Sequence, residues 1–234
     1  CVGQNDQASE QEDPVTDDTP TTIDEIDVQV PTVLDVPNEA GCDNLNPHHC
    51  MLPFPSDAYL VEDGSTQTGF RVNIPSGIIP ASGSTDPVEI PRINQIDGMS
   101  TATQIMTTFD SVPDLADVAY QYNIERSLEL DHPTIIWNVD DNHAVAHWVE
   151  LDARAQPGEQ TILHLRTAAA LEHDTRYVVV IHGLTDSMGD EIQPSQALQA
   201  LLDGEITDAE DVESRRSAYN EYIAAAENHM GVNK

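Results

Sequence analysis

Four strand-like segments follow one another in the second half of the chain, and they constrain the fold more than any other feature. They are rich in β-branched or alternating apolar residues and cover residues 134–139, 144–151, 161–166 and 176–182. The stretches between them are turn-forming and too short for the helix that a parallel crossover needs. The sequence therefore predicts a mainly β domain over residues 71–204, built as an antiparallel β-sandwich.

The first two of these segments are predicted to pair as a β-hairpin. Residues 140–143, Asp-Asp-Asn-His, supply turn chemistry between two apolar runs. Trp137 and Trp148 flank the turn and are expected to be structural residues of the core. A platform for carbohydrate or lipid is the alternative for these two indoles.

Two acidic turns are candidates for calcium binding. Asp140 and Asp141 lie in one turn, and Asp186 and Asp190 lie in the other. Carboxylate oxygens are the ligands that calcium prefers, although neither turn has the spacing of an EF-hand loop. The alternative is that both are ordinary turns without an ion, since Asp, Asn and Gly are common turn residues.

The sequence predicts no catalytic residue. Ser100 stands in Gly98-Met99-Ser100-Thr101-Ala102, which lacks the final glycine of a nucleophile elbow, so it is expected to cap a short helix. Three histidines on predicted strands are expected at polar-facing positions rather than in a metal site, because none has metal-motif spacing: His147, His164 and His182.

The last segment, residues 205–234, is predicted to contain an amphipathic helix from Asp208 to Met230. Its apolar face repeats at helical spacing and consists of Val212, Tyr219, Tyr222, Ile223, Ala226 and Met230. Asp208 and Asp211 are expected to cap the start of the helix, and Gly231 is expected to end it. We expect this helix to lead to a further domain or to a protein partner.

Residues 1–38 have the composition of a disordered acidic tether. No basic residue precedes Arg71, and the sparse apolar residues cannot build a core, although residues 28–36 could add an edge strand to the domain. The net charge of -33 argues against nucleic acid and anionic lipid headgroups as partners. No apolar run approaches the length of about 18 residues that a membrane-spanning helix needs.

The cysteines indicate export. A first residue Cys1 followed by a polar tether is typical of a lipoprotein after removal of its signal peptide, so Cys1 is predicted to carry the lipid anchor. The alternative is a sequence that begins at a cysteine by chance. Cys42 and Cys50 are expected to form a disulfide in an irregular, disulfide-stapled segment, residues 39–70. A metal site made of Cys42, His48, His49 and Cys50 is the alternative.

Residues 171–181 and 183–192 resemble bacterial immunoglobulin-like domains. In those domains a Thr-x-Tyr turn leads into a strand, and a Leu-x-Asp-x-x-Gly hairpin follows. The resemblance implies an immunoglobulin-like sandwich in which Tyr177 is a tyrosine corner, with its hydroxyl bonded back to the backbone. An ordinary half-buried tyrosine is the alternative.

A wider set of short motifs covers most of the chain after the tether. Residues 42–57, 94–100, 124–128 and 150–155 resemble the N-terminal region of large secreted bacterial lipoproteins of the esterase/lipase kind. The likeness extends over residues 42–232. It implies an accessory β-domain next to an α/β-hydrolase domain that lies beyond this chain, and a serine ester hydrolase if the full-length protein is an enzyme.

Three functions are therefore open, and the first is preferred. The chain is expected to be a non-catalytic accessory module of an exported, lipid-anchored protein, which positions a catalytic domain or partner. The alternative is a self-contained cell-surface binding or assembly lipoprotein that uses its sheet edges or its last helix. An independent enzyme comes third, because no nucleophile or metal set supports it. The expected location is outside the cytoplasm, at the cell surface or outer membrane.

Overall fold

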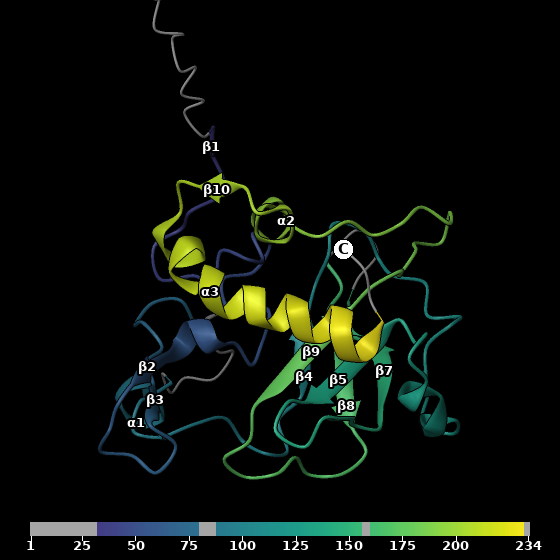
Figure 1. Cartoon of the computed structure of the whole chain (residues 1–234), viewed down its shortest axis with the longest axis horizontal. Coiled ribbons are helices and arrows are strands. Elements are labelled where there is room, and N and C mark those ends of the chain that lie inside the picture. The colour runs from purple at the N-terminus through teal and green to yellow at the C-terminus, as the bar shows by residue number, and fades with distance from the viewer. Residues whose placement is uncertain (1–31, 80–87, 156–159, 232–234) are drawn as a thin grey trace, which may run out of the picture. The chain divides into compact units, whose positions relative to one another are not determined.

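The structure of the protein is a computed structural model, which describes residues 32–79, 88–155 and 160–231 (Figure 1). Cys1 and most of the predicted tether lie outside these ranges. The described part is mainly β with a C-terminal helix, as the sequence predicts. Within the same ranges, no helix combines the length and the apolar character needed to cross a membrane.

The elements follow one another in a simple order. The strands are β1 (Val33–Leu34), β2 (Leu60–Glu62), β3 (Phe70–Val72), β4 (Ile105–Thr107), β5 (Thr134–Asn138), β6 (His143–Ala144), β7 (His147–Leu151), β8 (Leu163–Thr167), β9 (Tyr177–Ile181) and β10 (Ile206–Thr207). The helices are α1 (Ile90–Ile93), α2 (Gln196–Asp203) and α3 (Glu210–Ala225), which a π-turn extends over Ala226–Met230. Short 3-10 turns span Asp57–Tyr59 and Ile124–Leu128.

Two three-stranded antiparallel sheets share the main hydrophobic core. One has the strand order β4-β8-β7 and the other the order β6-β5-β9. Leu163 and Leu165 alternate with polar residues along β8, so both side chains enter the core, where they meet Val149 of β7 and Ile136 of β5. All four side chains are fully buried. The period-two pattern in the sequence thus correctly identified the buried face of β8.

The predicted hairpin is correct only at its turn. β6 pairs with β5 at two positions, Trp137 with Ala144 and Asn138 with His143. The returning chain then leaves β5, and β7 joins β8 in the other sheet, where Val149 lies opposite Leu165. After this change of partner, Val149 is fully buried in the core between the sheets, which favours the observed pairing.

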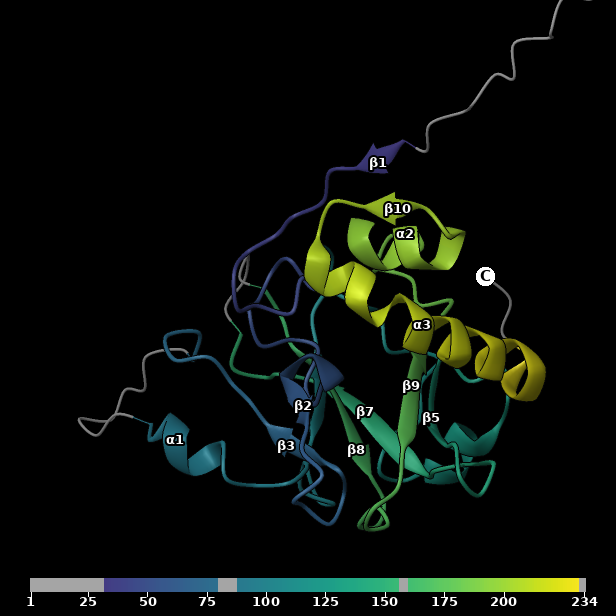
Figure 2. The ribbon, with the colours of Figure 1, turned by 60° about the vertical axis from the view of Figure 1, so that its left-hand side comes forward.

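The last helix covers the outer face of the β6-β5-β9 sheet. Ile135 and Trp137 of β5 point away from the inter-sheet core and pack with Val180 of β9, Ala226 and Met230. Figures 1 and 2 both show α3 crossing the sheet at β9. Trp137 is therefore buried, as the sequence predicts, although it lies under the last helix rather than between the two sheets.

The ends of α3 differ in part from the prediction. The helix begins at Glu210, two residues after Asp208, with Ala209 at the N-cap and no side-chain cap. Asp208 instead accepts a hydrogen bond from the backbone amide of Val36, at 3.1 Å. At the other end Gly231 has a φ of 67°, a left-handed conformation that glycine adopts without strain, and it ends the helix as expected.

The chain enters the described part beside α2 and α3. β1 pairs in parallel with β10, Val33 opposite Ile206 and Leu34 opposite Thr207, so the predicted edge strand near residues 28–36 exists at these two residues. Ser195 caps α2, because its hydroxyl accepts a hydrogen bond from the amide of Leu198. A second buried cluster holds this end together: Val36, Leu45, Ala197, Leu201, Ala209 and Val212.

Candidate binding cleft

A cleft of about 1360 Å³ lies between α3, the strands β4 and β9, and the disulfide-stapled segment. β4 is an edge strand of one sheet and β9 is an edge strand of the other. The cleft lies beside these two edges, which are not hydrogen-bonded to each other. The loop at residues 171–176 and the residues around Ser100 complete the wall. A cavity of this size and mixed polarity is large enough for a segment of another polypeptide.

The face of α3 that the sequence marks as apolar lines this cleft. Tyr222 and Ile223 are half-buried there, and the Tyr222 hydroxyl donates a hydrogen bond to the carboxylate of Asp57 at 3.2 Å. The ring of Tyr219 meets that of Tyr222 edge to face at 5.5 Å. Burial raises the pKa of both phenols, so they stay neutral hydrogen-bonding groups at physiological pH.

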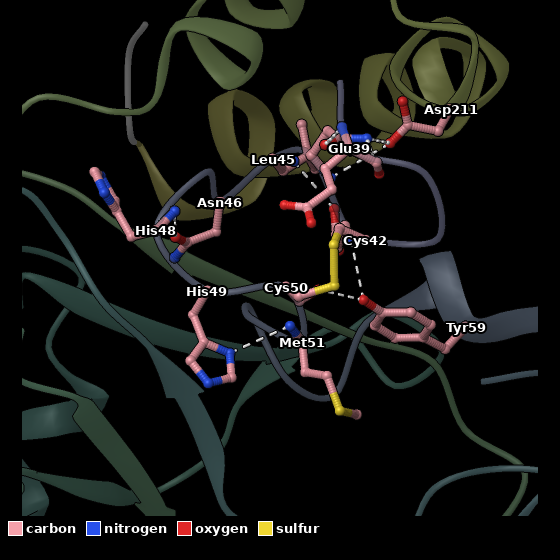
Figure 3. Close-up of a disulfide and its surroundings, with 12 residues drawn as sticks. Glu39, Cys42, Leu45, Asn46, His48, His49, Cys50, Met51, Tyr59 and Asp211 are labelled. Atoms are coloured by element: carbon pink, nitrogen blue, oxygen red, sulfur yellow. Dashed lines mark hydrogen bonds between the residues drawn. A yellow bond between two sulfur atoms is a disulfide. The ribbon is translucent and has the colours of Figure 1, made fainter. Parts of the chain in front are cut away.

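The disulfide Cys42–Cys50 is present, as predicted, and it closes a loop that contacts three different elements. Figure 3 shows the loop, with Tyr59 beside the disulfide. The Tyr59 hydroxyl accepts a hydrogen bond from the amide of Asp43 at 3.0 Å and donates one to the carbonyl of Cys50. Burial raises the pKa of Tyr59 to about 12. The metal site considered for Cys42, His48, His49 and Cys50 is thereby wrong, since both thiols are consumed by the disulfide.

Residues inside this loop connect it to the rest of the domain. Asn44 donates to the carboxylate of Asp211 on α3 at 3.0 Å. Ser195, the N-cap of α2, donates to the carbonyl of Leu45 at 2.6 Å. Asn46 donates to the carbonyl of Thr108, just after β4, at 3.0 Å. The loop therefore fixes the positions of α2, α3 and β4, which all border the cleft.

A buried ion pair completes this connection. The guanidinium of Arg215 on α3 lies 2.8 Å from the carboxylate of Asp43, whose side chain is fully buried. Asp57 and Asp211 lie 3.7 Å from the same guanidinium. Asp43 also accepts hydrogen bonds from the Ser56 hydroxyl and from the amide of Leu45. The charge of Asp43 is thus compensated within the protein, as a buried carboxylate requires.

Removing the disulfide is expected to destabilise the domain. The bridge joins residues separated by 8 positions, and closing a loop of this size raises the free energy of unfolding by about 2.5 kcal/mol, because it lowers the conformational entropy of the unfolded chain. The double variant Cys42→Ser/Cys50→Ser should unfold at lower urea concentration than the wild type, by an amount that corresponds to this energy. The matched control is Cys1→Ser, which leaves the disulfide intact. Equal midpoints for wild type and double variant would contradict the expectation.

Two of the four carboxylates proposed for calcium, those of Asp140 and Asp186, accept hydrogen bonds from backbone amides. Asp186 accepts hydrogen bonds from the amides of Met188 and Asp190, at 2.8 and 3.1 Å. Asp140 accepts from the amide of Arg176 at 3.2 Å, and the amides of Asp140 and Asp141 both donate to Asn138. Among the residues described, no three acidic, histidine or cysteine side chains come together as a metal site. Calcium binding at these turns stays a prediction.

Three aromatic residues are predicted to be structural: Tyr177, Trp137 and Trp148. The Tyr177 hydroxyl accepts a hydrogen bond from the amide of Glu172, five positions upstream, which is the contact that a tyrosine corner makes. Trp148 is half-buried on β7, and its indole Nε1 has no hydrogen-bond partner among the described residues. Trp137 and Trp148 therefore do not form a shared platform, because they lie on strands of different sheets.

Ser100 is one of the residues that line the cleft. Its hydroxyl is exposed and accepts a hydrogen bond from the amide of Ala102 at 3.3 Å, in a turn rather than at the start of the expected helix. No hydrogen bond joins it to a histidine within the described part of the chain. His182 also lines the cleft, half-buried, while His164 lies in β8 away from it.

A buried histidine pair is the polar feature that the sequence reasoning missed. The amide of Ala119 donates to Nε2 of His132 at 2.8 Å, which leaves Nδ1 to donate to the carbonyl of Thr134 at 2.7 Å. The Thr134 hydroxyl donates to Nε2 of His147 at 2.8 Å, and His147 Nδ1 donates to the carbonyl of Val145 at 2.9 Å. Both imidazole rings are thus neutral, and each of their ring nitrogens makes a hydrogen bond.

His147 was expected at a polar-facing position, and that expectation is wrong, because its side chain is completely buried. Burial lowers the pKa of both imidazoles, to about 4 for His147. The available signal was its spacing: His147 and the core residue Val149 lie two positions apart and therefore on the same side of one strand.

The cleft has a mixed polar and apolar lining. It presents apolar side chains and carboxylates, and Arg215 in its lining is engaged in the ion pair with the buried Asp43. Comparisons with models of protein families, with curated proteins and with solved structures give no significant match.

Proposed function

We propose that the described domain is a non-catalytic, immunoglobulin-like accessory module that holds a second polypeptide in the cleft beside α3. The observation that carries this proposal is the open cleft of about 1360 Å³, into which the half-buried side chains of Tyr222 and Ile223 extend from the last helix. Apolar side chains that remain half-exposed on an otherwise highly acidic protein favour contact with another protein surface. The second polypeptide is a catalytic domain or a separate partner.

The same proposal places the protein outside the cytoplasm, attached to a membrane through lipid on Cys1. The disulfide Cys42–Cys50 supports this location, because such bonds persist in oxidising compartments. The association with an ester hydrolase of the serine type is supported by the sequence motifs alone. The self-contained binding lipoprotein is the alternative, and it would use the same cleft.

The intact mass of the native protein, extracted from its membrane, separates these proposals. The accessory function predicts a species much heavier than 25.6 kDa, the mass of these residues, with one or more acyl groups on Cys1. A mass of 25.6 kDa plus lipid would replace the accessory function by the self-contained alternative. An unacylated Cys1 would contradict the anchor. Ester hydrolysis by residues 1–234 alone, lost in Ser100→Ala, would contradict the non-catalytic assignment.

A further inference from the structure

Among the described residues, one edge of β9 has no partner strand. In that part of the chain β9 pairs only with β5, and β5 lies between β6 and β9 in its sheet. Backbone hydrogen bonds from Val139 to the carbonyl of Arg176 and from His182 to the carbonyl of Pro133 flank the ladder. Because hydrogen-bonded positions alternate in an antiparallel pair, the backbone N–H and C=O groups of Val178 and Val180 point towards β5. Tyr177, Val179 and Ile181 therefore direct their N–H and C=O groups away from β5, along the wall of the cleft.

The other long sheet edges are covered. On β4, Met106 exchanges backbone hydrogen bonds with Phe54, at 2.8 and 2.7 Å. On β7, Val149 donates to the carbonyl of Ala119, and His147 donates to the Ser127 hydroxyl. No such bond involves the outward groups of β9 within the described residues.

β9 also lacks the usual protection of a free edge. Its sequence is Tyr-Val-Val-Val-Ile, with no lysine, proline or bulge to discourage pairing, and the side chain of Val179 is 37% exposed. An unpaired, β-branched edge of this kind is a template for an added strand.

The surroundings define the side chains of that strand. On one face of an added strand, the side chains would lie next to those of Val178 and Val180 and would contact Ile223 and Tyr222 of α3. On the other face, the side chains would contact Phe109, which follows β4. Side chains alternate between the two faces of a strand, so apolar residues are favoured at the positions that contact these groups.

The charge of the cleft defines the flanking residues. Its lining includes the carboxylates Asp57, Asp110, Asp140, Asp174, Glu191 and Glu227. The arginines of the lining are Arg176 and Arg215, and Arg215 is paired with the buried Asp43. Lysine or arginine residues of a bound segment would therefore be attracted, and an acidic segment would be repelled.

We propose that the cleft binds an extended, cationic segment of another polypeptide as a strand paired with the free edge of β9. This inference rests on the proposed function and specifies the chemistry of the bound polypeptide. The segment pairs over about five residues, the length of β9, alternates apolar residues and carries lysine or arginine at its ends.

The test uses residues 1–234 and the blocked synthetic peptide Lys-Val-Thr-Val-Thr-Val-Lys. Hydrogen exchange followed by NMR should show the amides of Tyr177, Val179 and Ile181 becoming protected when the peptide is added. Val179→Pro removes one outward N–H and leaves the ladder to β5 intact, because this amide faces away from β5. We expect it to weaken peptide binding about ten-fold. The conservative variant Val179→Thr keeps the N–H and should bind within about two-fold of the wild type.

The outcomes distinguish backbone pairing with β9 from binding elsewhere in the cleft that does not use the β9 edge. N-methylation of alternate peptide amides should abolish binding when the methyl groups face β9 and be tolerated at the other positions. Binding that is lost in Ile223→Asp but unchanged in Val179→Pro would overturn the strand pairing and retain the cleft as a binding site. No binding at millimolar peptide would overturn this inference, while the intact-mass measurement tests the accessory function independently.

Discussion

Replacing Arg215 with alanine is expected to lower the free energy of unfolding by about 3–5 kcal/mol. The variant leaves the Asp43 carboxylate, which is fully buried, without the guanidinium 2.8 Å away that compensates its charge. Hydrogen bonds from Ser56 and Leu45 remain, but neither supplies a positive charge. Since folded domains are stable by only about 5–15 kcal/mol, this loss should reduce the melting temperature by roughly 10 °C.

Chemical denaturation monitored by tryptophan fluorescence measures this effect directly. The matched control is Arg154→Ala, whose side chain is 92% exposed and pairs with Asp152 at the surface, where a loss of less than about 1 kcal/mol is expected. The double variant Asp43→Asn/Arg215→Met removes both charges and should recover much of the lost stability. A loss below 1 kcal/mol for Arg215→Ala would show that the buried pair does not hold α3 to the disulfide loop.

Lowering the pH from about 6.5 to 4 is expected to destabilise the protein through the buried histidines. The pKa of His147 in the folded protein is about 4, below its ordinary value of 6.5, so in this interval the unfolded chain binds the proton first. Stability is unaffected above pH 6.5 and is lost as the pH falls towards 4. The pKa difference corresponds to about 3 kcal/mol. His132 contributes in the same direction.

The variant His147→Gln isolates this contribution. It removes the titrating ring, so the difference in unfolding free energy between wild type and variant should shrink by about 3 kcal/mol between pH 7 and pH 4. Comparing the two proteins at each pH cancels the change in the large negative charge of the surface. The control His173→Gln removes an exposed imidazole and leaves the buried pair intact. A wild-type-to-variant difference that stays constant with pH would exclude the buried pair as the acid-sensitive group.

Glu213 is expected to cause a second loss of stability, in a lower pH range than that of the histidines. The guanidinium of Arg216 lowers the pKa of Glu213 to about 2, helped by hydrogen bonds from Thr207. A carboxyl group whose pKa is lower in the folded than in the unfolded protein stabilises the fold at a pH above the unfolded-state pKa. This contribution is lost as the pH falls from about 4.5 to 2. The histidine step is therefore complete before most of the Glu213 step begins.

Local patterns in the sequence were sufficient for the elements with one buried face. Leu163 and Leu165 enter the core because their alternation with His164 and Arg166 matches the pleat of a strand. Tyr222, Ala226 and Met230 follow the period of a helix and lie on the packed side of α3 and its π-turn. The disulfide could be predicted because a short turn-rich loop brings its two cysteines together.

Long-range choices could not be predicted in the same way. Residues 147–151 alternate equally well as a partner of β5 or of β8, and only the shared core around Val149 decides between them. The contact between Asp43 and Arg215 joins positions 172 residues apart, for which a single sequence contains no local signal. The cleft depends on both choices, because its walls come from segments distributed over most of the described chain.

The attachment of β1 also determines how a pulling force would act on the protein. β1 is held to β10 by two residue pairs, and Val36 is held to Asp208 by one hydrogen bond, so these contacts would break first under tension applied before Thr32. The chain released between Thr32 and Cys42 extends by at most about 35 Å. Tension then reaches a covalent loop closed at Cys50, which is bonded to α2, α3 and β4. The disulfide thereby limits the length of chain that can be pulled out before the force reaches the folded domain. The force is then distributed over several elements and does not separate the strands of one sheet one after another.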